Sequence, residues 1–138
     1  MGRIIALDYG KARTGIAVTD DLHLIASGLR TVETQNLMDF LIDYGQNEKL
    51  DLFVIGQPKQ MNNLPSESEN IIKPFIVRLS EKFPDIPIER QDERFTSKMA
   101  TRSLVESGIK KKRRQDKSLI DEVSAVLILQ AYLSKLKK

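Results

Sequence analysis

The sequence predicts one α/β domain over residues 1–138, in which helices flank a five-stranded mixed sheet. Two observations support this prediction. Three strand-like segments, 3–10, 15–20 and 22–32, follow one another through connectors only a few residues long, which is typical of an antiparallel meander. Beyond them, strand-like and helix-like segments alternate, which is typical of parallel strands joined by helices.

The last two strands of the sheet are expected in the second half of this pattern. The segment 51–56, DLFVIG, is short and almost wholly apolar, as an interior strand is. The segment 86–91, IPIERQ, alternates apolar and polar residues and predicts the fifth strand. The single histidine, His23, is expected on the exposed surface of the third strand.

Helical periodicity predicts four helices. The first carries apolar residues at i, i+3, i+4 and i+7, namely Leu37, Phe40, Leu41 and Tyr44. The second is expected after a polar loop, with Ser66 and Glu69 at the spacing of a capping box and a kink or a later start at Pro74. The third is expected over 96–107, and the fourth from Ser118 to the end of the chain.

The composition is that of an ordinary globular protein. Of the 138 residues, 41% are hydrophobic and 30% are charged, which suffices for one core. The absence of cysteine excludes disulfides and thiol catalysis. No signal-peptide pattern and no apolar run near the ~20 residues that span a bilayer occur, so we expect a cytoplasmic protein without a membrane partner.

Carboxylates mark the ends of two predicted strands and the start of the last helix. Strand alternation places Asp8 at the carboxyl end of the first strand, where α/β sheets generally bind ligands. Asp92 and Glu93 follow the fifth strand and, being consecutive, point to opposite faces, so at most one of them shares a face with Asp8. Asp121 begins the apolar stripe by which the last helix must pack on the sheet.

Carboxylates that converge repel one another unless a divalent cation compensates their charge. Ligands that are all oxygen favour Mg²⁺ or Mn²⁺ over zinc, and such ions can promote hydrolysis of a phosphodiester. Structural explanations exist for each residue apart from Asp8. Asp121 follows Ser118 at capping-box spacing, and Asp92 or Glu93 could pair with Arg94.

Four segments together resemble the YqgF family of pre-16S ribosomal RNA nucleases, which are also called Holliday junction resolvases. They are ALDYGKARTGIAVTD, VIGQPKQMN, DERFTSKMA and KSLIDEVSAVLILQAYL, and the resemblance covers nearly the whole chain. It implies a ribonuclease H-like fold and a metal-dependent nuclease that processes the 5′ end of the small-subunit rRNA precursor. By motif position it implies that Asp8, Glu93 and Asp121 bind the metal, with Asp92 as the substitute for Glu93.

Positive charge lies next to each of these carboxylates in the sequence, as contact with a polyanionic backbone requires. The candidate substrate-binding residues are Lys11, Arg13, Arg94, Lys98, Lys111, Lys112, Arg113 and Arg114. Only Tyr9 and Phe95 are placed to stack on bases, so we expect little sequence specificity. The expected partners are structured RNA, namely pre-16S rRNA, or branched DNA, and the small ribosomal subunit.

Three alternatives to the rRNA nuclease remain open at this point. A Holliday junction resolvase would need two active sites and hence a dimer. A non-catalytic ribosome-assembly factor would retain the fold and the binding of RNA. The segment DYGKARTG also resembles the first phosphate-binding turn of actin- and sugar-kinase-like ATPases, but those proteins need two such domains around one nucleotide.

Overall fold

The computed structural model describes residues 2–58, 69–92 and 117–136. The predicted helix over 96–107 lies outside these ranges. The elements are β1 (Arg3–Tyr9), β2 (Arg13–Thr19), β3 (Ala26–Glu33), the short 3₁₀ helix η1 (Thr34–Asn36), α1 (Leu37–Asn47), β4 (Leu50–Gln57), α2 (Glu69–Lys82), β5 (Ile88–Asp92) and α5 (Lys117–Leu136).

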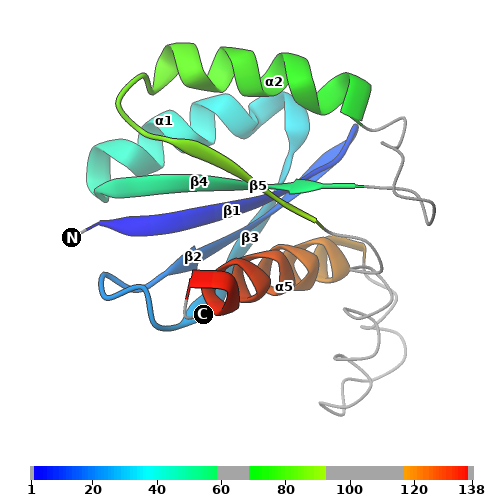
Figure 1. The fold of residues 1–138 in the computed structure, drawn as a ribbon. Coiled ribbons are helices and arrows are strands. Elements are labelled where there is room, and N and C mark those ends of the chain that lie inside the picture. Colours follow the sequence, from blue (N-terminus) through cyan, green and yellow to red (C-terminus); the bar gives the residue numbers. More distant parts are fainter. Residues whose placement is uncertain (1, 59–68, 93–116, 137–138) are drawn as a thin grey trace.

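The five strands form one mixed sheet in the order β3-β2-β1-β4-β5 (Figure 1). The first three strands are antiparallel neighbours, and β1, β4 and β5 are parallel to one another. The predicted meander and the predicted parallel strands are therefore both confirmed. The parallel order brings the carboxyl ends of β1, β4 and β5 to the same edge of the sheet.

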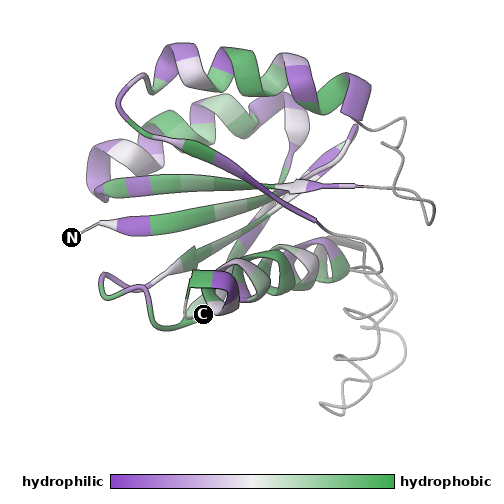
Figure 2. Ribbon diagram, viewed as in Figure 1, coloured by the Kyte–Doolittle hydropathy of each residue, from purple (hydrophilic) through white to green (hydrophobic). Residues whose placement is uncertain are grey.

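The buried apolar residues form two cores, one on each face of the sheet (Figure 2). Ile5 and Leu7 pack against α1 and α2 on one face, and Ile4 and Ala6 pack against α5 on the other. This is the alternation that the sequence predicts for the first strand. Since Asp8 follows Ala6 by two positions, its half-buried side chain belongs to the α5 face.

The third strand begins at Ala26, so the predicted start at residue 22 is wrong. Residues 20–25 form a turn instead, because Asp20 Oδ1 accepts hydrogen bonds from the backbone N–H groups of Leu24 at 2.8 Å and Ile25 at 2.9 Å. These bonds lower the pKa of Asp20, and the bond from Ile25 has the largest effect.

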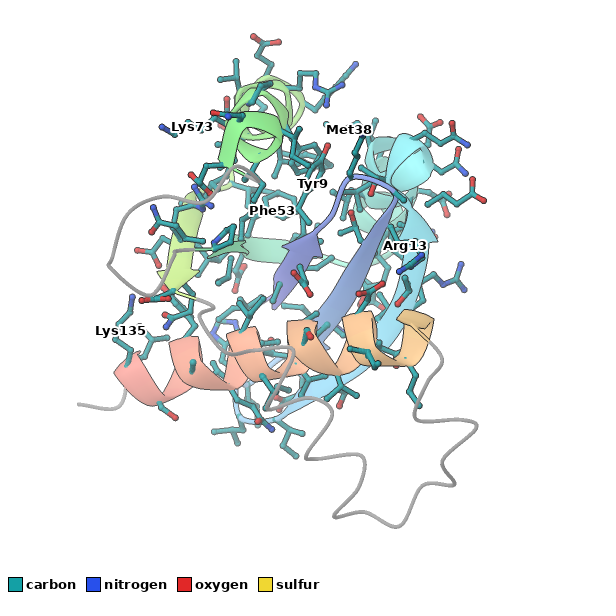
Figure 3. The ribbon with its side chains drawn as sticks, turned by 90° about the vertical axis from the view of Figure 1, so that its right-hand side faces the viewer. Tyr9, Arg13, Met38, Phe53, Lys73 and Lys135 are labelled. Carbon is teal, nitrogen blue, oxygen red and sulfur yellow. The ribbon has the colours of Figure 1, made fainter. Side chains whose placement is uncertain are left out.

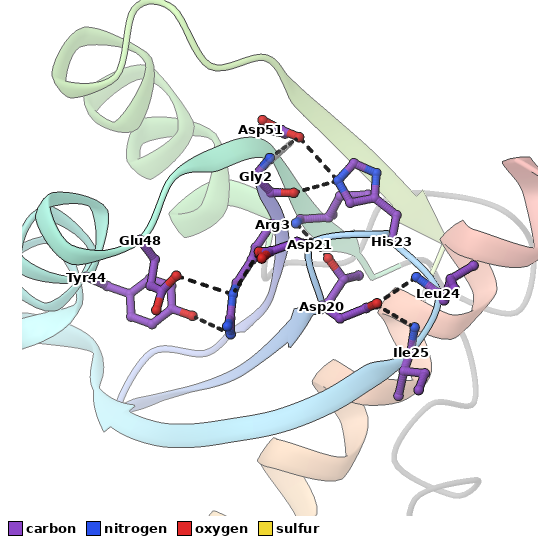
Figure 4. A network of polar contacts seen from close by, with 12 residues as sticks. Gly2, Arg3, Asp20, Asp21, His23, Leu24, Ile25, Tyr44, Glu48 and Asp51 are labelled. Carbon is purple, nitrogen blue, oxygen red and sulfur yellow. Dashed lines mark hydrogen bonds and ion pairs between the residues drawn. The ribbon is translucent and has the colours of Figure 1, made fainter.

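His23 lies in this turn and not on the sheet surface, so its predicted place is also wrong. Its φ of 58° is left-handed. Its ring nitrogen Nε2 lies 2.7 Å from the carbonyl oxygen of Gly2 and 3.2 Å from Asp51 Oδ2 (Figure 4). The histidine therefore ties the turn to the amino-terminal end of β1.

The second helix is already formed at Glu69 and contains Pro74, so the predicted later start is wrong. Proline removes the hydrogen bond to the carbonyl four residues earlier, which here belongs to Asn70. Both residues are exposed, so water can satisfy that carbonyl. Within the described part of the chain, no helix combines the length and the apolar character needed to cross a membrane.

Candidate active site

A row of four aligned residues crosses the sheet where β1, β4 and β5 end. Asp8 lies opposite Gly15 of β2 in the antiparallel register. The parallel register of β1 and β4 brings Gly56 beside Asp8, and Gly56 is paired with Gln91 of β5. We call these four residues, Gly15, Asp8, Gly56 and Gln91, the terminal row. Aligned residues on neighbouring strands point to the same face, so the terminal row faces α5. The row places one carboxylate between two residues that lack side chains.

Helix α5 contacts this row at Gly15. A Cβ atom at position 15 would collide with the main-chain oxygen of Asp121, so only glycine permits this approach. Because Gly15 is the register partner of Asp8, the contact brings Asp121 next to Asp8. The structure thus brings together the first and the last of the predicted carboxylates.

Arg13, at the start of β2, contacts the second of these carboxylates, Asp121. Its Nε donates a hydrogen bond to Asp121 Oδ2 at 2.9 Å, and both side chains remain partly exposed, at 39% and 26%. Figure 3 shows Arg13 above the first turns of α5. One of the predicted substrate-binding bases is therefore in direct contact with a predicted metal ligand.

The turn between β1 and β2 carries Lys11 and is fixed by Thr34 of η1. Thr34 Oγ1 donates to the carbonyl oxygen of Gly10 at 2.6 Å, and its backbone N–H donates to that of Ala12 at 2.9 Å. The turn borders an open hollow of about 430 Å³, which is lined by Lys11, Ala12, Arg13, Glu33 and Gln35. Two predicted bases therefore line one concave surface next to Asp121.

Asp92 lies on the face of the sheet opposite Asp8. Asp92 follows Arg90 by two residues and so points to the same face, where the Arg90 guanidinium contacts Glu69 of α2. Glu89 points to the other face and contacts Tyr132 of α5. The remaining predicted site residues lie outside the described residues: Glu93, Arg94, Lys98, Lys111, Lys112, Arg113 and Arg114. Among the residues that are described, no three acidic or histidine side chains gather into a metal-binding group.

Arg90 forms a buried network that the sequence analysis missed. Its guanidinium donates to the carbonyl oxygens of Ile55 at 3.2 Å and Gly56 at 2.9 Å, and pairs with Glu69, which is only 3% exposed. Glu69 therefore acts as the partner of a strand arginine, and its predicted partner Ser66 lies outside the described residues. The network fixes the end of β4 at the terminal row. The sequence offered one signal for this network, because Arg90 follows the inward-facing Ile88 by two residues and should therefore point to the same face.

Tyr9 does not serve as a stacking platform, so that expectation is wrong. It is 9% exposed and stacks on Phe75 of α2, with ring centroids 4.6 Å apart. Its ring therefore belongs to the core that α1 and α2 cover. Phe95 lies outside the described residues.

Comparisons with known proteins agree with this geometry. The chain is 57% identical over 133 residues to a protein of Porphyromonas gingivalis and 56% identical over 133 residues to one of Christiangramia forsetii, both named "Putative pre-16S rRNA nuclease". The alignments cover 96% of this chain and 96% and 98% of the two relatives.

The fold is similar to that of T. thermophilus RuvC, solved in complex with a Holliday junction substrate. The TM-score is 0.61 at 11% identity, covering 100% of this chain and 98% of that one. This likeness confirms the ribonuclease H-like fold. The sequence profile described as "RuvX: Holliday junction resolvase" matches residues 2–135. The resemblance noted in the sequence is thereby confirmed, and the chain belongs to the RuvX family.

Proposed function

We propose that this protein is a divalent-cation-dependent nuclease that hydrolyses phosphodiester bonds of RNA during 5′-end processing of pre-16S rRNA. The observation that supports the proposal is the contact of Gly15, the register partner of Asp8, with the main chain of Asp121. The names of the curated relatives support the substrate. A metal-dependent hydrolysis also agrees with a chain that has no cysteine and whose one histidine, His23, lies in a turn tied to the amino-terminal end of β1.

The residues present fit Mg²⁺ or Mn²⁺, because Asp8 and Asp121 offer carboxylate oxygens from two rigid elements. Glu93 is proposed as the third ligand in preference to Asp92, because Asp92 points to the α2 face, away from Asp8. A bound cation would polarise a phosphodiester and lower the pKa of a coordinated water. The chain itself would contribute the ligands and, through Arg13, a positive charge beside Asp121.

Lys11 and Arg13 are proposed to contact the phosphate backbone at the hollow next to Asp121. The other candidate bases, which lie outside the described residues, are proposed to contact phosphate as well: Arg94, Lys98, Lys111, Lys112, Arg113 and Arg114. Phosphate contacts of this kind position a strand without reading its sequence, and they make binding dependent on salt. Selection of a cleavage site would therefore depend on the shape of the RNA.

The test is cleavage of a 5′-labelled pre-16S fragment by purified protein with and without Mg²⁺. Asp8→Asn is expected to abolish cleavage and to leave thermal unfolding near that of the wild type. Asp43→Asn, the same exchange at an exposed site on α1, is the matched control and is expected to cut normally. Cleavage by Asp8→Asn at the wild-type rate would refute the metal site, and RNA binding without cleavage by the wild type would indicate an assembly factor.

A second candidate is cleavage of four-way DNA junctions, which the family description and the RuvC likeness favour. The same preparations are tested on a synthetic junction of equal strand length. Cleavage of the junction with no cleavage of precursor RNA would replace the RNA proposal by a resolvase. Measurement of the solution mass belongs with this test, because a resolvase needs paired active sites.

A further inference from the structure

Helix α5 crosses the α5 face of the sheet from β2 to β5. Near its start the main chain of Asp121 contacts Gly15 of β2, and eleven residues later the hydroxyl of Tyr132 donates to Glu89 of β5. Figure 3 shows this crossing below the ends of the strands. Ser124 follows Asp121 by one helical turn, so it lies on the same side of the helix. The path of α5 therefore carries Ser124 over the central strands, next to the terminal row.

Two buried oxygen atoms in this region have no hydrogen-bond partner among the described residues. Ser124 is 1% exposed, and its Oγ is unpartnered. Oε1 of Gln91, the last member of the terminal row, is also buried and unpartnered. Leaving such a group unsatisfied costs about 1–3 kcal/mol, so native proteins rarely do so unless water, an ion or a ligand supplies the partner.

A glycine separates Gln91 from Asp8 in the terminal row. Gly56 pairs with Gln91 and lies beside Asp8, and it has no side chain to fill the position between them. The side chains of Asp8 and Gln91 both point to the α5 face, from strands that lie two spacings of about 4.8 Å apart. A carboxylate and a buried amide oxygen thus lie on either side of Gly56, on the face that α5 and its buried Ser124 cover.

We propose that Gln91 Oε1 and Ser124 Oγ accept hydrogen bonds from water in the hydration shell of a cation held by Asp8. Mg²⁺ bound by one or two carboxylates keeps several waters, and each of these needs an acceptor. Gln91 and Ser124 are then positioning residues, which orient the shell without touching the ion. This inference rests on the metal site in the proposed function and adds the neutral oxygen groups around it.

The test is a calorimetric titration of Mg²⁺ into the purified protein without nucleic acid. Gln91→Met keeps the length of the side chain and removes the acceptor, and it is expected to weaken Mg²⁺ binding about tenfold, as loss of outer-shell partners generally does. Ser124→Ala is expected to weaken it severalfold. Gln57→Met is the matched control, because Gln57 follows Gly56 on the same strand and points to the opposite face. Its affinity for Mg²⁺ should equal that of the wild type.

Thermal unfolding without a cation gives a second, independent readout. Ser124→Ala removes an unpartnered buried hydroxyl, so it should be at least as stable as the wild type while binding Mg²⁺ less tightly. Lower stability would mean that the hydroxyl already has a partner and would overturn its part in the inference.

Asp8→Asn separates this inference from the proposed function. If Asp8→Asn abolishes Mg²⁺ binding while Gln91→Met and Ser124→Ala bind like the wild type, only the hydration-shell inference is wrong. If Asp8→Asn binds as well as the wild type, or the wild type does not bind, the proposed metal site is wrong as well.

Discussion

The ion pair between Arg13 and Asp121 sets a competition between an arginine and a metal ion for the same carboxylate. A cation bound at Asp121 must share this carboxylate with Arg13, which holds Oδ2, or displace it. Because both side chains are more than a quarter exposed, at 39% and 26%, the pair is worth at most about 1 kcal/mol. Arg13→Ala should therefore cost little stability and strengthen Mg²⁺ binding by up to about fivefold, which corresponds to 1 kcal/mol.

The same substitution should act in the opposite direction on nucleic acid. Loss of one phosphate contact should weaken RNA binding and reduce the slope of log K against log[salt] by about 0.7 for a single strand. Calorimetry with Mg²⁺ and fluorescence anisotropy with RNA at several salt concentrations measure the two effects. Arg78→Ala, which removes an exposed arginine of α2 on the other face, is the matched control. Unchanged Mg²⁺ affinity together with an unchanged salt slope would refute the reasoning.

Three further substitutions test other parts of the structure. Gly15→Ala should push α5 away from the sheet, cost about 1–3 kcal/mol in thermal unfolding and reduce cleavage at least tenfold; wild-type stability would contradict the contact with Asp121. Glu69→Gln leaves Arg90 without its buried counter-charge and should cost about 3 kcal/mol in urea unfolding, and a change below 1 kcal/mol would show that the pair is not needed. The lowered pKa of Asp20 stabilises the folded protein above the ordinary carboxyl pKa of about 4, and this contribution is lost as pH falls through the lowered value. Asp20→Asn should therefore flatten the acid side of the stability profile measured by urea unfolding between pH 2 and 5, and an unchanged profile would exclude this role.

Most of the sheet could be predicted because strand signals are local. The apolar runs of β1 and β4 and the short connectors specify both the strands and their direction. The start of β3 could not be predicted in the same way. Leu22, Leu24 and Ile25 look like strand residues but are exposed at 63%, 58% and 65%, because the side chain of Asp20 closes a turn around them. Two hydrogen bonds accepted by one side chain outweighed the hydrophobic pattern there.

The candidate site divides along the same line. The positions of Asp8 and Asp121 could be predicted, since a carboxylate at the end of a buried strand and one on a packed helical stripe each have a local signature. The contact at Gly15 was not, because it depends on which residue of α5 lies over which residue of β2. Alternation predicted that at most one of Asp92 and Glu93 shares the face of Asp8, and the register of β5 places Asp92 on the other face. The pairing of Arg90 with Glu69 could not be predicted, because it depends on how α2 and β5 lie relative to each other in the folded protein.

The attachment of α5 at both ends limits how its sequence can change. Asp121 contacts β2 and Tyr132 contacts β5, so the helix is attached to the sheet at two points. Each inserted or deleted residue would rotate one end by about 100° relative to the other. Side chains on the outer surface of the helix between these two points can be exchanged. The number of residues between Asp121 and Tyr132 should therefore stay constant while the identities of those surface residues change.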